Sequence, residues 1–140
     1  MSPLMDEEVL HIKRPLYQTM LAHLQENYPL EACGILAGSA NQVAHLYPID
    51  NILNSPVAYK MDPQQQIQAM IDLEVRGWEM AAIFHSHPTG PERPSSTDIT
   101  QAYYPESVTI IVSLADRDRP VVRGFHIKNG RYHEVTLNVE

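Results

Sequence analysis

The 140-residue chain has a single cysteine, Cys33, and few basic side chains. One cysteine cannot form an internal disulfide bond, so the fold must rely on its packed core. The sequence also lacks an 18-residue apolar run and a charged-then-apolar signal segment. We therefore expect a cytoplasmic protein without a membrane partner.

Positive charge is scarce, with 10 Lys and Arg against 17 Asp and Glu and a formal net charge of −7. Nucleic-acid binding depends on Lys and Arg side chains that neutralise phosphates, and no cluster of them occurs here. We expect no nucleic-acid partner. The composition, 44% hydrophobic and 19% charged, is typical of a folded domain, and the length predicts one domain over residues 1–140.

Periodic apolar residues and turn signals predict an α+β domain, in which helices flank a mixed, mostly antiparallel curved sheet, with a three-layer α/β/α arrangement. The first helix spans 15–27, the second begins at Pro63 after an Asp62 cap and buries Ile67, Met70, Ile71 and Val75, and a short third helix spans 98–104. The main strands are predicted at 9–12, 31–38, 42–49, 79–87, 107–114, 121–127 and 132–139. The last two of these strands are joined through Asn129-Gly130, a pair typical of type I′ hairpins.

Two histidines, His85 and His87, stand two residues apart at the end of an apolar strand. Residues i and i+2 of a strand point to the same face, so both imidazoles can reach one ion. The other five histidines are single residues, for which hydrogen-bonded or exposed side chains are the simpler interpretation. The pair therefore predicts a metal site.

A third ligand is available at Asp98, across a loop stiffened by Pro88, Pro91 and Pro94. Two histidines and a carboxylate match a catalytic zinc site, which keeps its fourth position open for water. The stretch from Ser95 to Asp98 also matches a capping box that begins the next helix, and both interpretations can hold together. A fixed Ser95 could aim its hydroxyl at negative charge that develops near the metal.

Glu31 is the candidate proton acceptor. It precedes a run of small and apolar residues that we expect in the core sheet, where an acid without a function is unusual. A carboxylate that takes a proton from an activated water contributes roughly 10²–10⁴-fold in rate. Cys33 shares this strand and is interpreted as a small buried thiol.

Glu31, followed by His85-Ser86-His87-Pro88 and then by Ser95-x-x-Asp98, resembles the signature of the JAMM (MPN+) metalloprotease family. Segments 29–38 and 59–63 also resemble that family, and the likeness covers most of the chain. The resemblance implies a cytidine-deaminase-like fold and one Zn²⁺ per chain, held by His85, His87 and Asp98. It further implies that Glu31 is the general base, that Ser95 stabilises the tetrahedral oxyanion, and that Ser86 supports the site.

The size of the chain is similar to that of compact prokaryotic family members. The resemblance implies hydrolysis of a peptide or isopeptide bond after the C-terminal tail of a ubiquitin-like or sulfur-carrier protein. Two alternatives stay open: a non-catalytic MPN-type scaffold that binds protein partners, and a zinc peptidase with an unrelated peptide substrate. The sequence leaves the oligomeric state undetermined.

Overall fold

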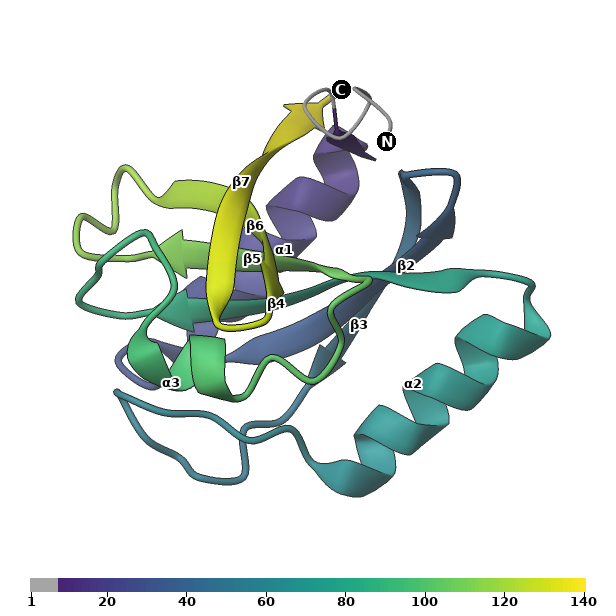
Figure 1. Cartoon of the computed structure of the whole chain (residues 1–140). Helices are drawn as coiled ribbons and strands as arrows, with labels where there is room; N and C mark the ends of the chain where they lie inside the picture. The colour runs from purple at the N-terminus through teal and green to yellow at the C-terminus, as the bar shows by residue number, and fades with distance from the viewer. Residues whose placement is uncertain (1–7) are drawn as a thin grey trace.

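A computed structural model describes residues 8–140, and in it seven strands close into a barrel in the order β1-β3-β2-β4-β5-β6-β7 (Figure 1). The strands are β1 (Val9–Ile12), β2 (Cys33–Ser39), β3 (Gln42–Ile49), β4 (Glu79–His87), β5 (Val108–Ser113), β6 (Val121–Lys128) and β7 (Arg131–Val139). The helices are α1 (Arg14–Asn27), α2 (Pro63–Val75) and α3 (Ser96–Thr100). Residues 1–7, which the one-domain prediction includes, lie outside the described residues.

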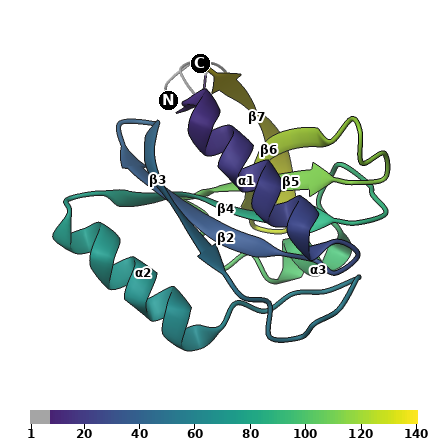
Figure 2. The ribbon, with the colours of Figure 1, turned by 180° about the vertical axis from the view of Figure 1, so that it is seen from behind.

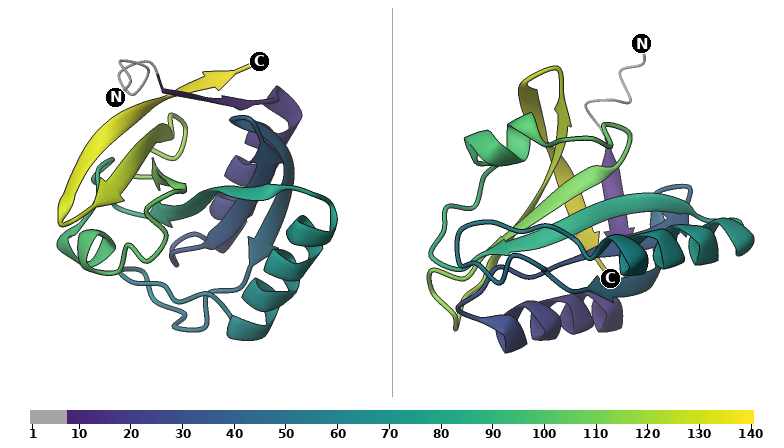
Figure 3. Two further views of the ribbon diagram at one scale, coloured as in Figure 1. Left: turned by 45° about the vertical axis from the view of Figure 1, so that its right-hand side comes forward. Right: turned by 90° about the horizontal axis from the view of Figure 1, so that it is seen from below.

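The sheet is mixed, and antiparallel pairs predominate, as predicted. β1 runs parallel to both β3 and β7, β4 runs parallel to β5, and the remaining neighbours are antiparallel. The short β1 joins the two ends of the sheet, and the curvature of β6 and β7 brings them within its reach (Figure 3). An α+β fold is thereby confirmed. The three-layer and cytidine-deaminase-like details are not confirmed, because the strands close into a barrel.

Helix α1 crosses the back of the barrel (Figure 2). Pro15 lies in its first turn, where a missing N–H group leaves no helical hydrogen bond unmade. Met20 and Leu24 are fully buried in the cluster that contains Leu36 and Phe84. Burial of these side chains therefore fixes α1 to the face of β2 and β4 that carries Leu36 and Phe84.

Helix α2 lies beside the barrel (Figure 1), and its apolar face is not the predicted one. Ala69 and Leu73 are buried, whereas Ile67, Ile71 and Val75 are 57%, 59% and 81% exposed. The helix carries two apolar stripes, and the stripe with the smaller Ala69 packs on the cluster around Cys33 and Ile35. The sequence period alone could not decide which stripe faces the barrel.

Several element boundaries differ from the predictions, and two of the differences lie near the candidate site. β2 begins at Cys33, so Glu31 lies just before the strand. α3 ends at Thr100 and does not reach Tyr104. Tyr104 precedes Pro105, and a residue before proline is disfavoured in the helical region. Among residues 8–140, no helix combines the length and the apolar character needed to cross a bilayer.

Candidate active site

The carboxyl end of β4 carries both candidate ligand histidines into the interior. His85 pairs with Cys33 of β2 on one side and with Ile111 of β5 on the other. Only 1% of His85 and 6% of His87 is exposed. The central place of β4 in the sheet thus buries two imidazoles that a terminal loop would leave in water.

The two rings converge with the Asp98 carboxylate. His85 Nε2 lies 3.2 Å from His87 Nε2, and the two nitrogens lie 3.1 and 3.0 Å from Asp98 Oδ1 and Oδ2. Within the described part of the chain, these three residues form the one group of His, Cys, Asp or Glu side chains that could hold a metal ion. The predicted ligands therefore meet at one point.

Asp98 is positioned by the start of α3. The Ser95 hydroxyl accepts a hydrogen bond from the Asp98 backbone N–H at 3.0 Å, and the Ser95 N–H donates to Asp98 Oδ2 at 2.9 Å. Both halves of the predicted capping box are therefore formed. Because Asp98 Oδ1 faces His85 while Oδ2 accepts the Ser95 bond, capping and metal binding are compatible.

Electrostatics keep the Asp98 carboxylate ionised. Burial alone would raise its pKa, but hydrogen bonds from His85 and His87 hold the pKa well below its usual range. Burial lowers the pKa of His87, yet its bonds with Asp98 and with the Pro91 carbonyl outweigh that effect and raise it. The group thus favours an anionic carboxylate, as a metal ligand requires.

The two histidines are held in different ways. His87 Nδ1 lies 2.7 Å from the Pro91 carbonyl oxygen, a contact that orients a metal-binding imidazole through its second nitrogen. His85 Nδ1 is buried without a hydrogen-bond partner among the described residues. Its ring instead stacks on Tyr59, with centroids 4.6 Å apart and planes 28° apart.

Glu31 reaches the site because β2 and β4 are antiparallel neighbours. Cys33 pairs with His85, so the chain just before β2 lies beside the end of β4. Ser86 fixes this junction: its N–H donates to the Ala32 carbonyl, and its hydroxyl accepts the Ala32 N–H, each at 3.0 Å. The pairing of β2 with β4 therefore places the chain at Glu31 beside the end of β4.

Glu31 is only 7% exposed, and burial raises its pKa to about 7. His87 lowers this pKa and Asp98 raises it, so the carboxylate lies within electrostatic reach of both ligands. A carboxylate with a pKa near 7 can take up and release a proton at neutral pH. Cys33 shows no such activation, because burial raises the pKa of its thiol to about 12.

The donor set fits zinc. Zn²⁺ binds imidazole nitrogen and carboxylate oxygen at about 2.0–2.2 Å, and the corners of such a tetrahedron are roughly 3.3 Å apart. The two imidazole nitrogens are 3.2 Å apart, each lies 3.0–3.1 Å from one of the two Asp98 oxygens, and one ligand atom from each of the three residues can be chosen so that all three lie within 4.8 Å of one another. The three side chains are therefore close enough together to share a single ion.

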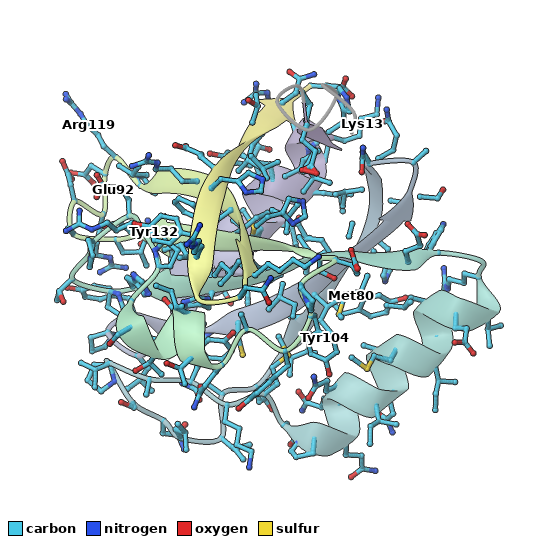
Figure 4. The ribbon with its side chains drawn as sticks, in the orientation of Figure 1. Lys13, Met80, Glu92, Tyr104, Arg119 and Tyr132 are labelled. Carbon is cyan, nitrogen blue, oxygen red and sulfur yellow. The ribbon has the colours of Figure 1, made fainter. Side chains whose placement is uncertain are left out.

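A cavity of about 360 Å³ adjoins this site. It is lined by Glu31, by Ala32, by residues of α1 and by the turn that follows β3. Tyr104 lies between α3 and α2, where its hydroxyl accepts a 3.3 Å hydrogen bond from Gln66 (Figure 4). Glu31 therefore borders this cavity and also lies within electrostatic reach of His87 and Asp98.

Sequence reasoning missed the contacts of Tyr59 and Pro91. Tyr59 belongs to segment 59–63, which was noted for its resemblance to the family and given no role at the site, and Pro91 was considered only as a stiffening residue. Neither the stacking of Tyr59 on His85 nor the contact of the Pro91 carbonyl with His87 requires a particular spacing of residues, so neither can be recognised in the sequence. Ser86, by contrast, was expected to support the site, and its hydroxyl does bond the Ala32 N–H.

A family model described as "Prokaryotic homologs of the JAB domain" matches residues 13–126. The chain is similar to the CysO-cysteine peptidase of Mycobacterium tuberculosis, with 32% identity over 133 residues that cover 94% of this chain and 91% of the relative. It is also similar to the "Probable TtuB-protein conjugate cleaving protease" of Thermus thermophilus, with 40% identity over 95 residues, 67% of this chain and 64% of that protein.

The solution structure of a Desulfitobacterium hafniense protein superimposes with a TM-score of 0.84 and 36% identity, covering 94% of this chain and 92% of that one. Helices, barrel and site-bearing strands therefore follow an arrangement already seen by experiment in a similar protein.

Proposed function

Because the chain belongs to the family of prokaryotic homologs of the JAB domain, we propose that it is a zinc-dependent peptidase or isopeptidase. Its substrate would be the bond after the C-terminal tail of a ubiquitin-like or sulfur-carrier protein. Membership of this family confirms the resemblance to JAMM metalloproteases inferred from the signature residues. The relatives described above are named as a peptidase and a protease.

One observation carries the proposal: three candidate ligands converge within 3.0–3.2 Å of one another beside a buried glutamate whose pKa is near 7. A structural zinc site is usually closed by four protein ligands, whereas a catalytic site keeps a position for water. Three ligands with an adjacent base suit the catalytic type. A scaffold protein would need neither the base nor its raised pKa.

Each residue has a distinct role in the proposed reaction. His85, His87 and Asp98 hold one Zn²⁺, which when bound lowers the pKa of a water molecule and polarises the scissile carbonyl. Glu31 accepts the proton of the attacking water and later gives it to the leaving amine. Its pKa near 7 suits both transfers, because neither form is strongly favoured at neutral pH.

Ser95 supplies the remaining interaction. Its hydroxyl oxygen accepts the Asp98 N–H, which leaves the hydroxyl hydrogen free to donate. A donor held in place before the reaction stabilises an oxyanion without reorganisation. We assign Ser95 this role in addition to its capping of α3.

The substrate class is inferred from the relatives. One is named for a CysO-cysteine substrate and another for conjugates of TtuB. We infer that this chain likewise cleaves after the tail of a small carrier or modifier protein, and that residues 1–140 act as one domain. A zinc peptidase with an unrelated peptide substrate is the second candidate, because no contact among the described residues specifies the C-terminal sequence of a carrier or modifier protein.

The test is a release assay on a panel of ubiquitin-like and sulfur-carrier proteins, each fused through its tail to a reporter peptide or linked to lysine, with an unrelated peptide fusion as the control. Zinc content is measured on the same preparations. We expect one zinc per chain and zinc-dependent release from the tail fusions. Preferential cleavage of the unrelated fusion would favour the second candidate, and a metal-free native protein without activity would favour the scaffold.

A further inference from the structure

We propose that Asn51 is a positioning residue that holds the proposed base Glu31 in place through its backbone. This inference rests on the proposed function, because it assigns a role relative to that base. Asn51 follows β3 and stands in a polar connection for which the sequence suggested no role. Its side chain lies between the chain at Glu31 and the segment 51–60 that leads to α2.

The Asn51 amide uses its full hydrogen-bonding capacity on backbone groups. Nδ2 donates to the carbonyl oxygens of Glu31 and Ala58 at 2.9 and 3.1 Å. Oδ1 accepts the N–H groups of Leu53 and Lys60, each at 3.0 Å. Two donors and two acceptors match the two hydrogens and two lone pairs of a primary amide, so one orientation of the side chain satisfies all four groups.

Glu31 has no strand partner of its own, because β2 begins two residues later. Its backbone carbonyl is bound by Asn51, and its backbone N–H donates to the Ser55 carbonyl at 2.8 Å. Both polar backbone groups of the proposed base are therefore satisfied by the 51–60 segment. The direction in which the Glu31 carboxylate projects therefore depends on that segment. The Asn51 side chain links the two ends of the segment through its bonds to Leu53, Ala58 and Lys60.

The same segment reaches the metal site by a second route. Tyr59 stands between Ala58 and Lys60, the two residues whose backbone groups Asn51 binds, and its ring stacks on His85. His85 Nδ1 has no hydrogen-bond partner among the described residues, so the stacking supports the ring in addition to the contact between Nε2 and Asp98. One amide thus connects the base and a candidate ligand.

Two variants separate the contributions of Asn51. Asn51→Ala removes all four bonds. Asn51→Asp keeps the acceptors for the Leu53 and Lys60 N–H groups, but it replaces both donor bonds with repulsion between a carboxylate oxygen and the Glu31 and Ala58 carbonyl oxygens. Val57→Ala is the matched control, because Val57 lies in the same segment and is 80% exposed.

In the release assay on a ubiquitin-like tail fusion, we expect both Asn51 variants to lose about 10–100-fold in kcat, with KM changed little, as is typical of residues that orient a catalytic group. The same substitution is then made in the Glu31→Gln variant. There, Asn51→Ala should lower kcat by a factor at least about tenfold smaller than in the parent, because the carboxylate that Asn51 positions is already absent. Equal losses in both backgrounds would show a merely structural role and overturn the proposal.

Measurements on the metal-free protein provide readouts independent of activity. Amide hydrogen exchange of Leu53 and Lys60 should quicken in Asn51→Ala and stay near the parent rate in Asn51→Asp and Val57→Ala. Zinc affinity, measured by competition with a chelator, should fall about 10–100-fold in Tyr59→Leu and stay near the parent value in Tyr59→Phe.

The two levels of inference fail separately. If Glu31→Gln is inactive while Asn51→Ala and Asn51→Asp turn over like the parent, the role of Asn51 is wrong and the proposed function stands. If Glu31→Gln cleaves as fast as the parent, the assignment of the base is wrong, and the role of Asn51 falls with it.

Discussion

The barrel carries two groups of two histidines and one carboxylate, and they differ in almost every physical respect. One consists of His85, His87 and Asp98. The other consists of His126 and His133, which are cross-strand partners on β6 and β7, and Glu8. In the second group, Glu8 Oε2 lies 2.9 Å from His126 Nε2, and the two rings lie 5.5 Å apart at 42°.

Convergence and burial separate the two groups. The side chains of His85, His87 and Asp98 are at most 9% exposed, and all three donor atoms meet. His133 is exposed and the Glu8 side chain is 32% exposed, and this second group does not qualify as a possible metal site. Residue types alone therefore do not define a metal centre. Strand position and a fixed carboxylate do.

The sharpest test of this contrast is His87→Ala against His126→Ala. We expect His87→Ala to lose stoichiometric zinc and to reduce turnover to background, because two remaining ligands hold a zinc ion poorly. His126→Ala should keep both zinc and activity. Elemental analysis and the release assay measure the two effects, and zinc retained in His87→Ala would refute the ligand assignment.

The next comparison is between two glutamates, Glu31 near the first group and Glu8 in the second. It sets Glu31→Gln against Glu8→Gln. Glu31→Gln should keep its zinc and lose about 10²–10⁴-fold in turnover, because the amide cannot accept the proton of water. Glu8→Gln should turn over like the parent. A Glu31→Gln variant as fast as the parent would mean that another group is the base.

A smaller effect is expected from the cap that fixes Asp98. Ser95→Ala should lower the free energy of unfolding by about 1 kcal/mol through loss of the N-cap, and zinc affinity by about tenfold as Asp98 becomes less well oriented. Denaturant titration and chelator competition measure these quantities. Ser96→Ala, at an exposed position next in the chain, is the control and should change neither.

The smallest effect concerns stability and pH in the metal-free protein. Burial raises the pKa of Glu31 from its ordinary 4.5 to about 7, so the folded state favours the protonated form. Its contribution to stability is present in full below pH 4.5 and is lost as pH rises through 7. Glu31→Gln should therefore match the parent near pH 4 and become the more stable protein above pH 7.

Denaturant titrations from pH 4 to 8 measure this difference, and Glu26→Gln, at an exposed position on α1, controls for the loss of one carboxylate. An unchanged difference between parent and Glu31→Gln across that range would show that Glu31 is not desolvated in the folded protein.

Local patterns predicted the local geometry well where the physics is local. The spacing of His85 and His87 on a strand places both rings on one face, because the strand period is two. Ser95 and Asp98 form their capping box because the residues that bond are three apart. Pro15 and Asp62 begin their helices for equally local reasons.

Where several tertiary arrangements satisfy the same local pattern, the prediction was incomplete or wrong. The face of α2 that packs, the closure of the sheet by β1, and the stacking of Tyr59 on His85 depend on contacts between segments far apart in the chain. None of these contacts produces a periodic pattern or a fixed spacing of residues that could be recognised in the sequence.

The amino-acid sequence alone thus determined the three candidate ligands and the kind of chemistry they suit. The tertiary structure decided that Glu31 lies beside them and that Asn51 and Ser55 hold its backbone. The register between β2 and β4 places Glu31 beside the candidate ligands. A strand register is fixed by hydrogen bonds and packing along the whole length of the paired strands. A single residue such as Glu31 cannot encode that register.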